Sequence, residues 1–228
     1  MGILYIIATP IGNLGDITLR ALEVLKSVDL VVCEDTRQTV KLLNHYQIKK
    51  PLVSYFQHSK LSKIEYIAEK LREGKNVALV TDAGTPGISD PGGILVSKLT
   101  SEYVNKEEIK VVPIPGPCAA IAALSVSGFP TDKFVFMGFP PHKKGREKYF
   151  KEVASAEHTV VFYESTHRIL KALEQIKSLI PERQIMVARE ITKMFESIYR
   201  GTAGEVLEIL NSDKDNFKGE FVVVINKI

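Results

Sequence analysis

Asp82-Ala83-Gly84-Thr85-Pro86-Gly87-Ile88-Ser89-Asp90-Pro91-Gly92-Gly93 separates two apolar runs, residues 77–80 and 94–99. The segment holds four of the chain's fifteen glycines and two of its eleven prolines, a layout that predicts a buried strand, a rigid loop and a helix. Glycines let the backbone approach a ligand closely, and prolines fix its path. An ordinary connection is the alternative, but most need only about two to six residues. We therefore interpret the segment as a ligand-binding loop.

The composition is that of an ordinary globular protein, with 45% hydrophobic and 25% charged residues among 228. A net charge of +3 permits an anionic partner without requiring one. The two cysteines lie far apart and form no CxxC pair, which argues against a zinc or redox motif. The apolar run over residues 1–8 lacks a basic leader and is too short to span a bilayer. We expect a reduced, cytoplasmic protein that has no membrane partner.

Strand-like and helix-like segments alternate along the chain, which predicts an α/β protein. In the first half the predicted strands are continuously apolar, and such strands are typical of a parallel sheet covered by helices on both faces. In the second half, two strands around residues 189–200 are closely spaced and favour a mixed sheet. The Pro-rich turn at 113–117 is the predicted boundary. We predict an N-terminal parallel-sheet α/β domain over residues 1–113 and a C-terminal mixed-sheet α/β domain over residues 117–228.

Several common catalytic signatures are missing from the sequence. It contains no GxxxxGK[ST] phosphate loop, no GxGxxG after the first strand, no GxSxG elbow and no HExxH. The five histidines show no metal-ligand spacing, so we expect no metal site.

Four loops follow predicted strands, namely residues 9–16, 34–37, 82–93 and 113–117. Because the carboxyl ends of parallel strands share one edge of a sheet, we expect these loops to lie together. Two interpretations of the second loop remain open. Asp35 is either the cap of the next helix beside a solvated Glu34, or it joins Thr36 and Arg37 in gripping a hydroxylated, charged substrate.

A basic stretch, residues 142–151, is the main cationic cluster of the chain; it contains His142, Lys143, Lys144, Arg146, Lys148 and Lys151. Such runs are usually solvated surface. The alternative is RNA binding, which would act mostly through phosphates and depend steeply on salt.

Six motifs along the chain are similar, in order, to those of a known family. They are residues 8–18, 34–37, 82–92, 113–117, 162–168 and 188–193. Together they resemble the bacterial 16S ribosomal RNA 2′-O-ribose methyltransferases of the tetrapyrrole methylase superfamily, essentially from end to end. Two departures are small, Cys118 where relatives often carry Ser and Thr166 where Pro is common.

The resemblance implies two α/β domains with S-adenosylmethionine (SAM) bound in a cleft between them. It also implies a homodimer that methylates the ribose 2′-hydroxyl of a cytidine in the decoding region of 16S rRNA, within the small ribosomal subunit. Backbone groups of Gly/Pro loops suit the amino-acid and adenine ends of SAM without a metal. Our hypothesis for the cofactor pocket is Pro10, Asp82, Ala83, Gly84, Pro86, Gly87, Ile88, Ser89, Pro115, Gly116, Ala119, Ala120 and Tyr163.

Methyl transfer needs in-line alignment and help with a poorly acidic hydroxyl. A carboxylate among Glu34, Asp35 and Asp82 is the candidate base, and Arg37 or Arg189 is the candidate anchor for the adjacent phosphate. The predicted RNA contacts are Arg37, Lys143, Lys144, Arg146 and Arg189. Two other functions remain open: methylation of a tetrapyrrole or corrinoid, and a non-catalytic ribosome-assembly factor that binds SAM and RNA.

Overall fold

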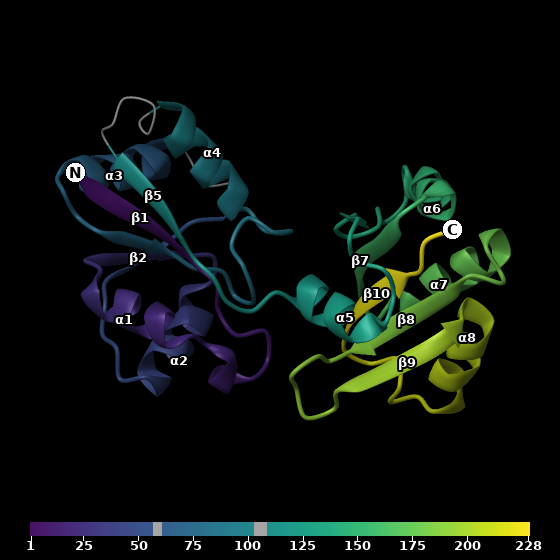
Figure 1. Ribbon diagram of the computed structural model, residues 1–228. Coiled ribbons are helices and arrows are strands. Elements are labelled where there is room, and N and C mark those ends of the chain that lie inside the picture. Colours follow the sequence, from purple (N-terminus) through teal and green to yellow (C-terminus); the bar gives the residue numbers. More distant parts are fainter. Residues whose placement is uncertain (57–60, 103–108) are drawn as a thin grey trace. The chain divides into compact units, whose positions relative to one another are not determined.

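The computed structural model describes residues 1–56, 61–102 and 109–228, and is shown in Figure 1. The chain divides into two compact units, unit 1 over Met1–Cys118 and unit 2 over Ala119–Ile228. Each unit is an α/β structure with its own five-stranded sheet, which confirms the predicted fold class. No helix within the described ranges is both long and apolar enough to cross a membrane.

Unit 1 contains a fully parallel sheet in the order β3-β2-β4-β1-β5. Four of its strands fall on the apolar runs read from the sequence. The short edge strand β3 was not anticipated, because its three residues are only half-buried and show no extended apolar run. The strands are β1 (Gly2–Ile7), β2 (Leu30–Cys33), β3 (Leu52–Ser54), β4 (Val77–Leu79) and β5 (Ile109–Ile114).

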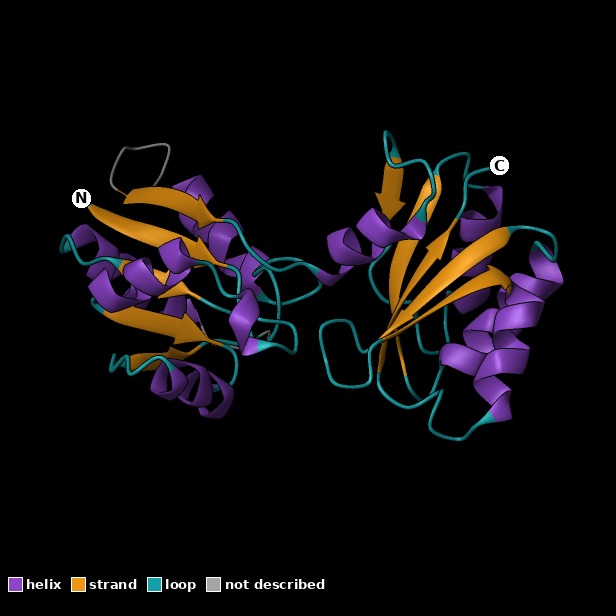
Figure 2. Ribbon diagram, turned by 60° about the horizontal axis from the view of Figure 1, so that its bottom comes forward, coloured by secondary structure: helices purple, strands orange, loops and turns teal. Residues whose placement is uncertain are grey.

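Helices cover both faces of this sheet (Figure 2). Helices α1 (Leu19–Ser27) and α2 (Thr36–His45) pack on one face against strand residues such as Val31. Helices α3 (Leu61–Arg72) and α4 (Gly92–Glu102) pack on the other, against residues such as Val32. Successive residues of one strand thus enter opposite cores, which is why the strands read as continuously apolar.

Unit 2 contains a mixed sheet in the order β6-β7-β10-β8-β9. Strands β6 and β7 are parallel, and the remaining neighbours are antiparallel. The closely spaced pair around residues 189–200 is the antiparallel pair β8 and β9. The strands are β6 (Phe134–Phe136), β7 (Thr159–Ser165), β8 (Gln184–Arg189), β9 (Ser197–Thr202) and β10 (Glu220–Ile225).

The core of unit 2 lies between this sheet and three helices, α6 (Arg146–Ser155), α7 (Ile169–Leu179) and α8 (Ala203–Ser212). Phe150 and Phe162 are fully buried there and meet edge to face, with ring centroids 6.1 Å apart. Helix α5 (Ala119–Ser127) lies against β7 and β10.

The two units divide between Cys118 and Ala119. The residues just before this point pack with unit 1, since Thr85 Oγ1 donates a hydrogen bond to the carbonyl oxygen of Pro117 at 3.0 Å. A Cβ added at Gly116 would lie 3.0 Å from the Cβ of Ala8. The Pro-rich segment after β5 is therefore a strand-end loop of unit 1.

Candidate active site

The loops after β1 and β4 are joined directly by their main chains. Thr9 N–H donates to the carbonyl oxygen of Gly84 at 2.9 Å, and Gly84 N–H donates back to Thr9 at 3.1 Å. The buried Thr9 hydroxyl adds a bond to the carbonyl oxygen of Thr81 at 3.0 Å. This bridge brings Pro10 and Gly84 to one edge of the sheet, as the strand-end argument predicted.

The long loop is held in shape by Asp90. Its Oδ1 accepts hydrogen bonds from the N–H groups of Gly87 at 2.8 Å and Gly92 at 2.6 Å. Gly84 and Gly87 both have φ of +87°, a conformation that side chains rarely adopt. Ser89 is also left-handed, with φ of 60°, and such non-glycine residues gather at ligand sites. The loop is therefore a fixed backbone surface.

Groups in this loop remain available to a ligand. Asp90 Oδ2 is buried and has no hydrogen-bond partner within the described ranges, so it leaves an acceptor for an N–H or cationic group. Across the same ranges, the main-chain N–H groups of Ala83 and Thr85 donate no hydrogen bond. A Cβ at Gly116 would crowd the Cβ of Ala8, 3.0 Å away, so this position favours glycine. A ligand carrying a carboxylate, an amine and a purine, as SAM does, fits these donors and acceptors.

The four predicted catalytic residues also meet at this edge. Asp35 caps α2, since its Oδ1 accepts from the N–H of Arg37 at 2.8 Å, and its carboxylate pairs with the Arg37 guanidinium at 2.6 Å. Asp82 Oδ1 accepts from the N–H of Asp35 at 3.2 Å, which ties the second loop to the long loop. The capping interpretation of Asp35 is thus confirmed.

The carboxyl groups of Glu34 and Asp35 differ in acidity. The Arg37 hydrogen bonds lower the pKa of Asp35 to about 2. Desolvation raises the pKa of Glu34, and the nearby charges of Asp82, Asp90 and Asp35 raise it further. Among the candidate bases, Glu34 therefore has a raised proton affinity and Asp35 a lowered one.

Three of the predicted cofactor residues, Ala119, Ala120 and Tyr163, lie in unit 2. The N–H of Ala120, in the first turn of α5, donates to the Tyr163 hydroxyl at 3.2 Å. The Tyr163 ring packs against Phe136 and Phe139, with centroids 5.0 and 5.4 Å apart. These contacts fix the start of α5 against β7 and pack the Tyr163 ring in an aromatic cluster.

The structure corrects the prediction that Arg146 and Arg189 contact RNA. Arg146 is only 5% exposed, and it pairs with the fully buried Glu164 at 3.3 Å and donates to Gln175 at 2.8 Å. Arg189 is 9% exposed and donates to the carbonyl oxygens of Lys218 and Phe195. Both guanidinium groups already hold internal acceptors, so neither presents its charge to a phosphate.

Sequence reasoning overlooked two residues that hold the backbone near the predicted site residues, Asp90 in the long loop and Glu164 beside Tyr163 in β7. The Asp-Pro-Gly order at 90–92 is a known turn signal, because an Asp side chain bonds the backbone two residues on. Glu164 gave no comparable signal, since a glutamate in a strand is usually exposed. No group of three or more His, Cys, Asp or Glu side chains in the described part of the chain has a metal-binding arrangement.

Unit 1 carries a rigid Gly/Pro loop at the carboxyl edge of a parallel sheet, and carboxylates of unequal acidity lie beside it. This arrangement is typical of proteins that bind a small ligand and act on it chemically. The chain belongs to the tetrapyrrole (corrin/porphyrin) methylase family, whose sequence profile matches residues 3–207. The chain is therefore a methyltransferase.

Its relatives include rRNA-modifying enzymes. The chain is 48% identical to the ribosomal RNA small subunit methyltransferase I of Escherichia coli O157:H7, over 98% of this chain and 77% of that protein. It is 45% identical to the protein of the same name from Thermotoga maritima, over 99% of each. The fold is similar to that of a diphthine synthase, with a TM-score of 0.71 at 16% identity, covering 99% of this chain and 90% of the other. A uroporphyrin-III-C-methyltransferase from Thermus thermophilus is also similar, with a TM-score of 0.65 at 19% identity, covering 100% and 95%.

Proposed function

We propose that this protein transfers a methyl group from SAM to the 16S rRNA of the small ribosomal subunit. The observation that carries the proposal is the 45–48% identity, over nearly the whole chain, to enzymes named for that activity. The matches to tetrapyrrole-pathway methylases are below 20% identity and support the fold alone. The strand-end loops around Thr9 and Gly84 support the retention of a cofactor site.

The finer proposal is that the acceptor is the ribose 2′-hydroxyl of a cytidine in the decoding region. The protein would then work in the cytoplasm on the assembled or assembling small subunit, as a homodimer. These details rest on the resemblance of the six motifs to the rRNA 2′-O-methyltransferases.

The loops of unit 1 supply the groups that would hold SAM. The main-chain N–H groups of Ala83 and Thr85 suit its carboxylate or adenine acceptors, and Asp90 Oδ2 suits its ammonium group. Gly84 and Gly116 let the backbone approach closely, as bound cofactors often require. The remaining contacts of unit 1 are proposed from Pro10, Asp82, Pro86, Gly87, Ile88, Ser89 and Pro115. In unit 2 they are Ala119, Ala120 and Tyr163.

The chemistry requires alignment and one proton transfer. Bound SAM supplies a methyl group already activated on a sulfonium, so the chain must chiefly hold the hydroxyl oxygen in line with it. We propose Glu34 as the group that accepts the hydroxyl proton, because its raised pKa makes it a stronger base than Asp35. Asp82 holds the Asp35 N–H and keeps the two loops in register.

Arg37 is proposed to contact the phosphate beside the reacting ribose. Its side chain is 85% exposed although it pairs with Asp35. A guanidinium has five N–H donors, so it can bind a phosphate while two of them hold the carboxylate.

The test is to incubate the purified protein with methyl-labelled SAM and small subunits that lack the modification, and to map the label by nuclease digestion and mass spectrometry. We expect label on the ribose of one cytidine. Label on a base would overturn the 2′-O assignment. Binding of SAM without transfer would favour the assembly-factor alternative, and transfer to uroporphyrinogen or a corrinoid instead would favour the tetrapyrrole alternative.

A further inference from the structure

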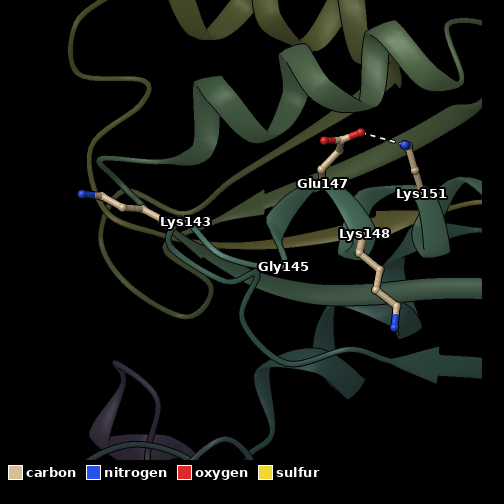
Figure 3. Close-up of a pocket in the computed structure, with 5 residues that line it drawn as sticks. All are labelled: Lys143, Gly145, Glu147, Lys148 and Lys151. Carbon is tan, nitrogen blue, oxygen red and sulfur yellow. Dashed lines mark ion pairs between the residues drawn. The ribbon is translucent and has the colours of Figure 1, made fainter.

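A basic hollow lies on unit 2 at the start of α6, and the function proposed above does not use it. Its volume is about 540 Å³, and it is lined by Lys143, Gly145, Glu147, Lys148 and Lys151 (Figure 3). We refer to it as the lysine hollow. Four of its five lining residues are charged, and none is apolar.

The charges in the lysine hollow do not cancel. Glu147 pairs with Lys151 at 2.7 Å, as the dashed line in Figure 3 marks. Lys143 and Lys148 have no ion pair within the described residues, and Figure 3 shows their side chains extending in different directions from the backbone around Gly145. Lys144, exposed beside them, adds a further positive charge. The hollow therefore carries a net positive charge, spread over several points.

A network of ion pairs around a buried glutamate fixes the backbone next to these lysines. Glu164 is fully buried and pairs with Arg146 at 3.3 Å and with Arg168 at 2.9 Å. Arg146 also donates to the carbonyl oxygen of Pro141 at 3.3 Å, and Arg168 donates to that of Pro140 at 3.0 Å. The network thus anchors the backbone at Pro140 and Pro141, immediately before the residues that line the lysine hollow.

The turn itself is closed by the N–H of Arg146, which donates to the carbonyl oxygen of Lys143 at 3.2 Å. Gly145 has φ of +87° and caps α6 without a side chain. Lys143 and Lys144 are therefore presented on a preformed turn and Lys148 and Lys151 on the helix that follows it, so less conformational entropy is lost when a ligand binds.

The lining chemistry selects the ligand class. Protein partners usually need an apolar or aromatic anchor at the centre of the contact, and this hollow has none. Sites for small organic ligands are likewise lined mostly by hydrophobic and aromatic side chains, and no such side chain lines this hollow. Separated ammonium groups on a rigid turn suit successive phosphates of a nucleic-acid backbone, where most of the affinity comes from charge.

We propose that the lysine hollow binds the phosphate backbone of small-subunit rRNA, through Lys143, Lys148 and the neighbouring Lys144 and Lys151. The choice of RNA rests on the function proposed above. The buried Glu164 network is the positioning element, and it explains why Arg146, although part of the basic stretch, makes no contact itself.

The test is the double variant Lys143→Gln/Lys148→Gln in the full-length protein. Its matched control is Lys26→Gln/Lys214→Gln, which removes the same charge from two exposed lysines without an ion pair in the described residues. Lys214 follows α8. Helix α7 packs against both α6 and α8, so Lys214 is separated from the hollow at the start of α6. Affinity for unmodified small subunits is measured over a range of salt concentrations, together with SAM affinity by calorimetry.

We expect the hollow variant to bind subunits about tenfold to 100-fold more weakly at 0.1 M salt, and the slope of log K against log salt to become shallower by about 1 to 2. SAM affinity should stay unchanged, and the control should behave as the unmodified protein. Equal affinity and slope in both double variants would overturn the proposal. So would a defect that disappears on protein-free 16S rRNA, because it would place the contact on a ribosomal protein.

Failure of the proposed function would look different. If the unmodified protein transfers no methyl group but the hollow variant still loses salt-dependent subunit binding, the lysine hollow stands and the methylation proposal falls. If methyl transfer is normal and the hollow variant matches the control in KM for subunits, the methylation proposal stands and the hollow falls.

Discussion

Glu34 and Asp35 are adjacent in sequence, yet their carboxyl groups have opposite properties. Asp35 bonds the first turn of α2 and the Arg37 guanidinium, so its charged form is stabilised. Glu34 is partly desolvated and lies near three other carboxylates, so its charged form is disfavoured. A group that must accept a proton from a hydroxyl needs a high proton affinity. The environment of Glu34 raises that affinity, and the environment of Asp35 lowers it.

Glu34→Gln should therefore lower the turnover of methyl transfer by about 100-fold or more while SAM affinity is kept. Because the pKa of Glu34 is raised, the turnover of the unmodified protein should fall with decreasing pH at values above those at which an ordinary glutamate is protonated. The pH dependence of single-turnover rates checks this.

The matched variant is Asp35→Asn, which keeps an N-cap residue and should leave turnover within a few fold. The lowered pKa of Asp35 means that its capping contribution is present above pH 4 and is lost as the pH falls towards about 2. A collapse of turnover in Asp35→Asn with a fully active Glu34→Gln would reverse the two roles.

Gly84 and Gly74 have nearly the same left-handed backbone, with φ of +87° and +83°. Replacing either by Ala should cost about 1 kcal/mol of stability, because the strain is the same. A Cβ at Gly84 would lie 3.3 Å from Ile11 Cγ2, whereas a Cβ at Gly74 meets nothing within 4 Å. Only Gly84→Ala should weaken SAM binding, by about tenfold, and isothermal calorimetry on both variants checks this. Equal SAM affinity in the two variants would remove Gly84 from the pocket.

At the scale of elements, a buried charge network joins α6, β7 and the N-cap residue of α7. Glu164 in β7 is fully buried and is held by Arg146 at the start of α6 and by Arg168 at the N-cap of α7. Buried charges are costly to desolvate, and removing one partner leaves the others uncompensated. The prediction that Arg146 contacts RNA failed because this arginine lies in a run of surface lysines, which gives no sign that it is buried.

Glu164→Gln should lower the free energy of unfolding by about 3 to 5 kcal/mol, since the buried Arg146 and the half-buried Arg168 both lose their counter-charge. Urea denaturation measures it. Glu152→Gln, an exposed position on α6, is the control and should change stability by less than about 0.5 kcal/mol. A Glu164→Gln protein as stable as the control would show that the network positions nothing.

At the scale of the whole molecule, the hydrophobic cores of the two units are separate, with two on opposite faces of the sheet in unit 1 and another in unit 2. Leu71 is fully buried in one of the cores of unit 1 and Leu173 in that of unit 2. Separate cores allow separate unfolding, so a single two-state transition is not required.

We expect calorimetry to resolve two transitions in the absence of SAM. Leu71→Ala should lower one of them and Leu173→Ala the other, each by about 2 to 5 kcal/mol of unfolding free energy. SAM at 100 times its dissociation constant should stabilise the transition that Leu71→Ala affects by about 2.7 kcal/mol, because unit 1 supplies most of the proposed SAM contacts. One transition lowered equally by both substitutions would instead indicate a single cooperative fold.

Much of the fold could be predicted from the sequence because it depends on local pattern. Apolar runs in the sequence mark most of the strands in the described ranges, whereas the short, half-buried β3 gives no such signal. Gly74 follows α3 in the left-handed conformation typical of a residue that ends a helix, and its N–H bonds the carbonyl oxygen of Leu71 at 3.0 Å. The loops of the site were found the same way, because parallel strands deliver them to one edge.

By itself, then, the sequence determined the alternation of strands and helices, the rigid Gly/Pro loops and the family to which the chain belongs. These depend on residues near one another along the chain, whose backbone preferences and spacing can be read directly. Only the tertiary structure shows which charged groups are paired inside the protein and which remain accessible to a substrate. Arg146, Arg189 and Glu164 are buried by partners distant in sequence, whereas the pKa of Glu34 is raised by desolvation first and then by the charges of Asp82 and Asp90 in another loop. Burial and Coulomb interactions act through space, so only the folded chain reveals them.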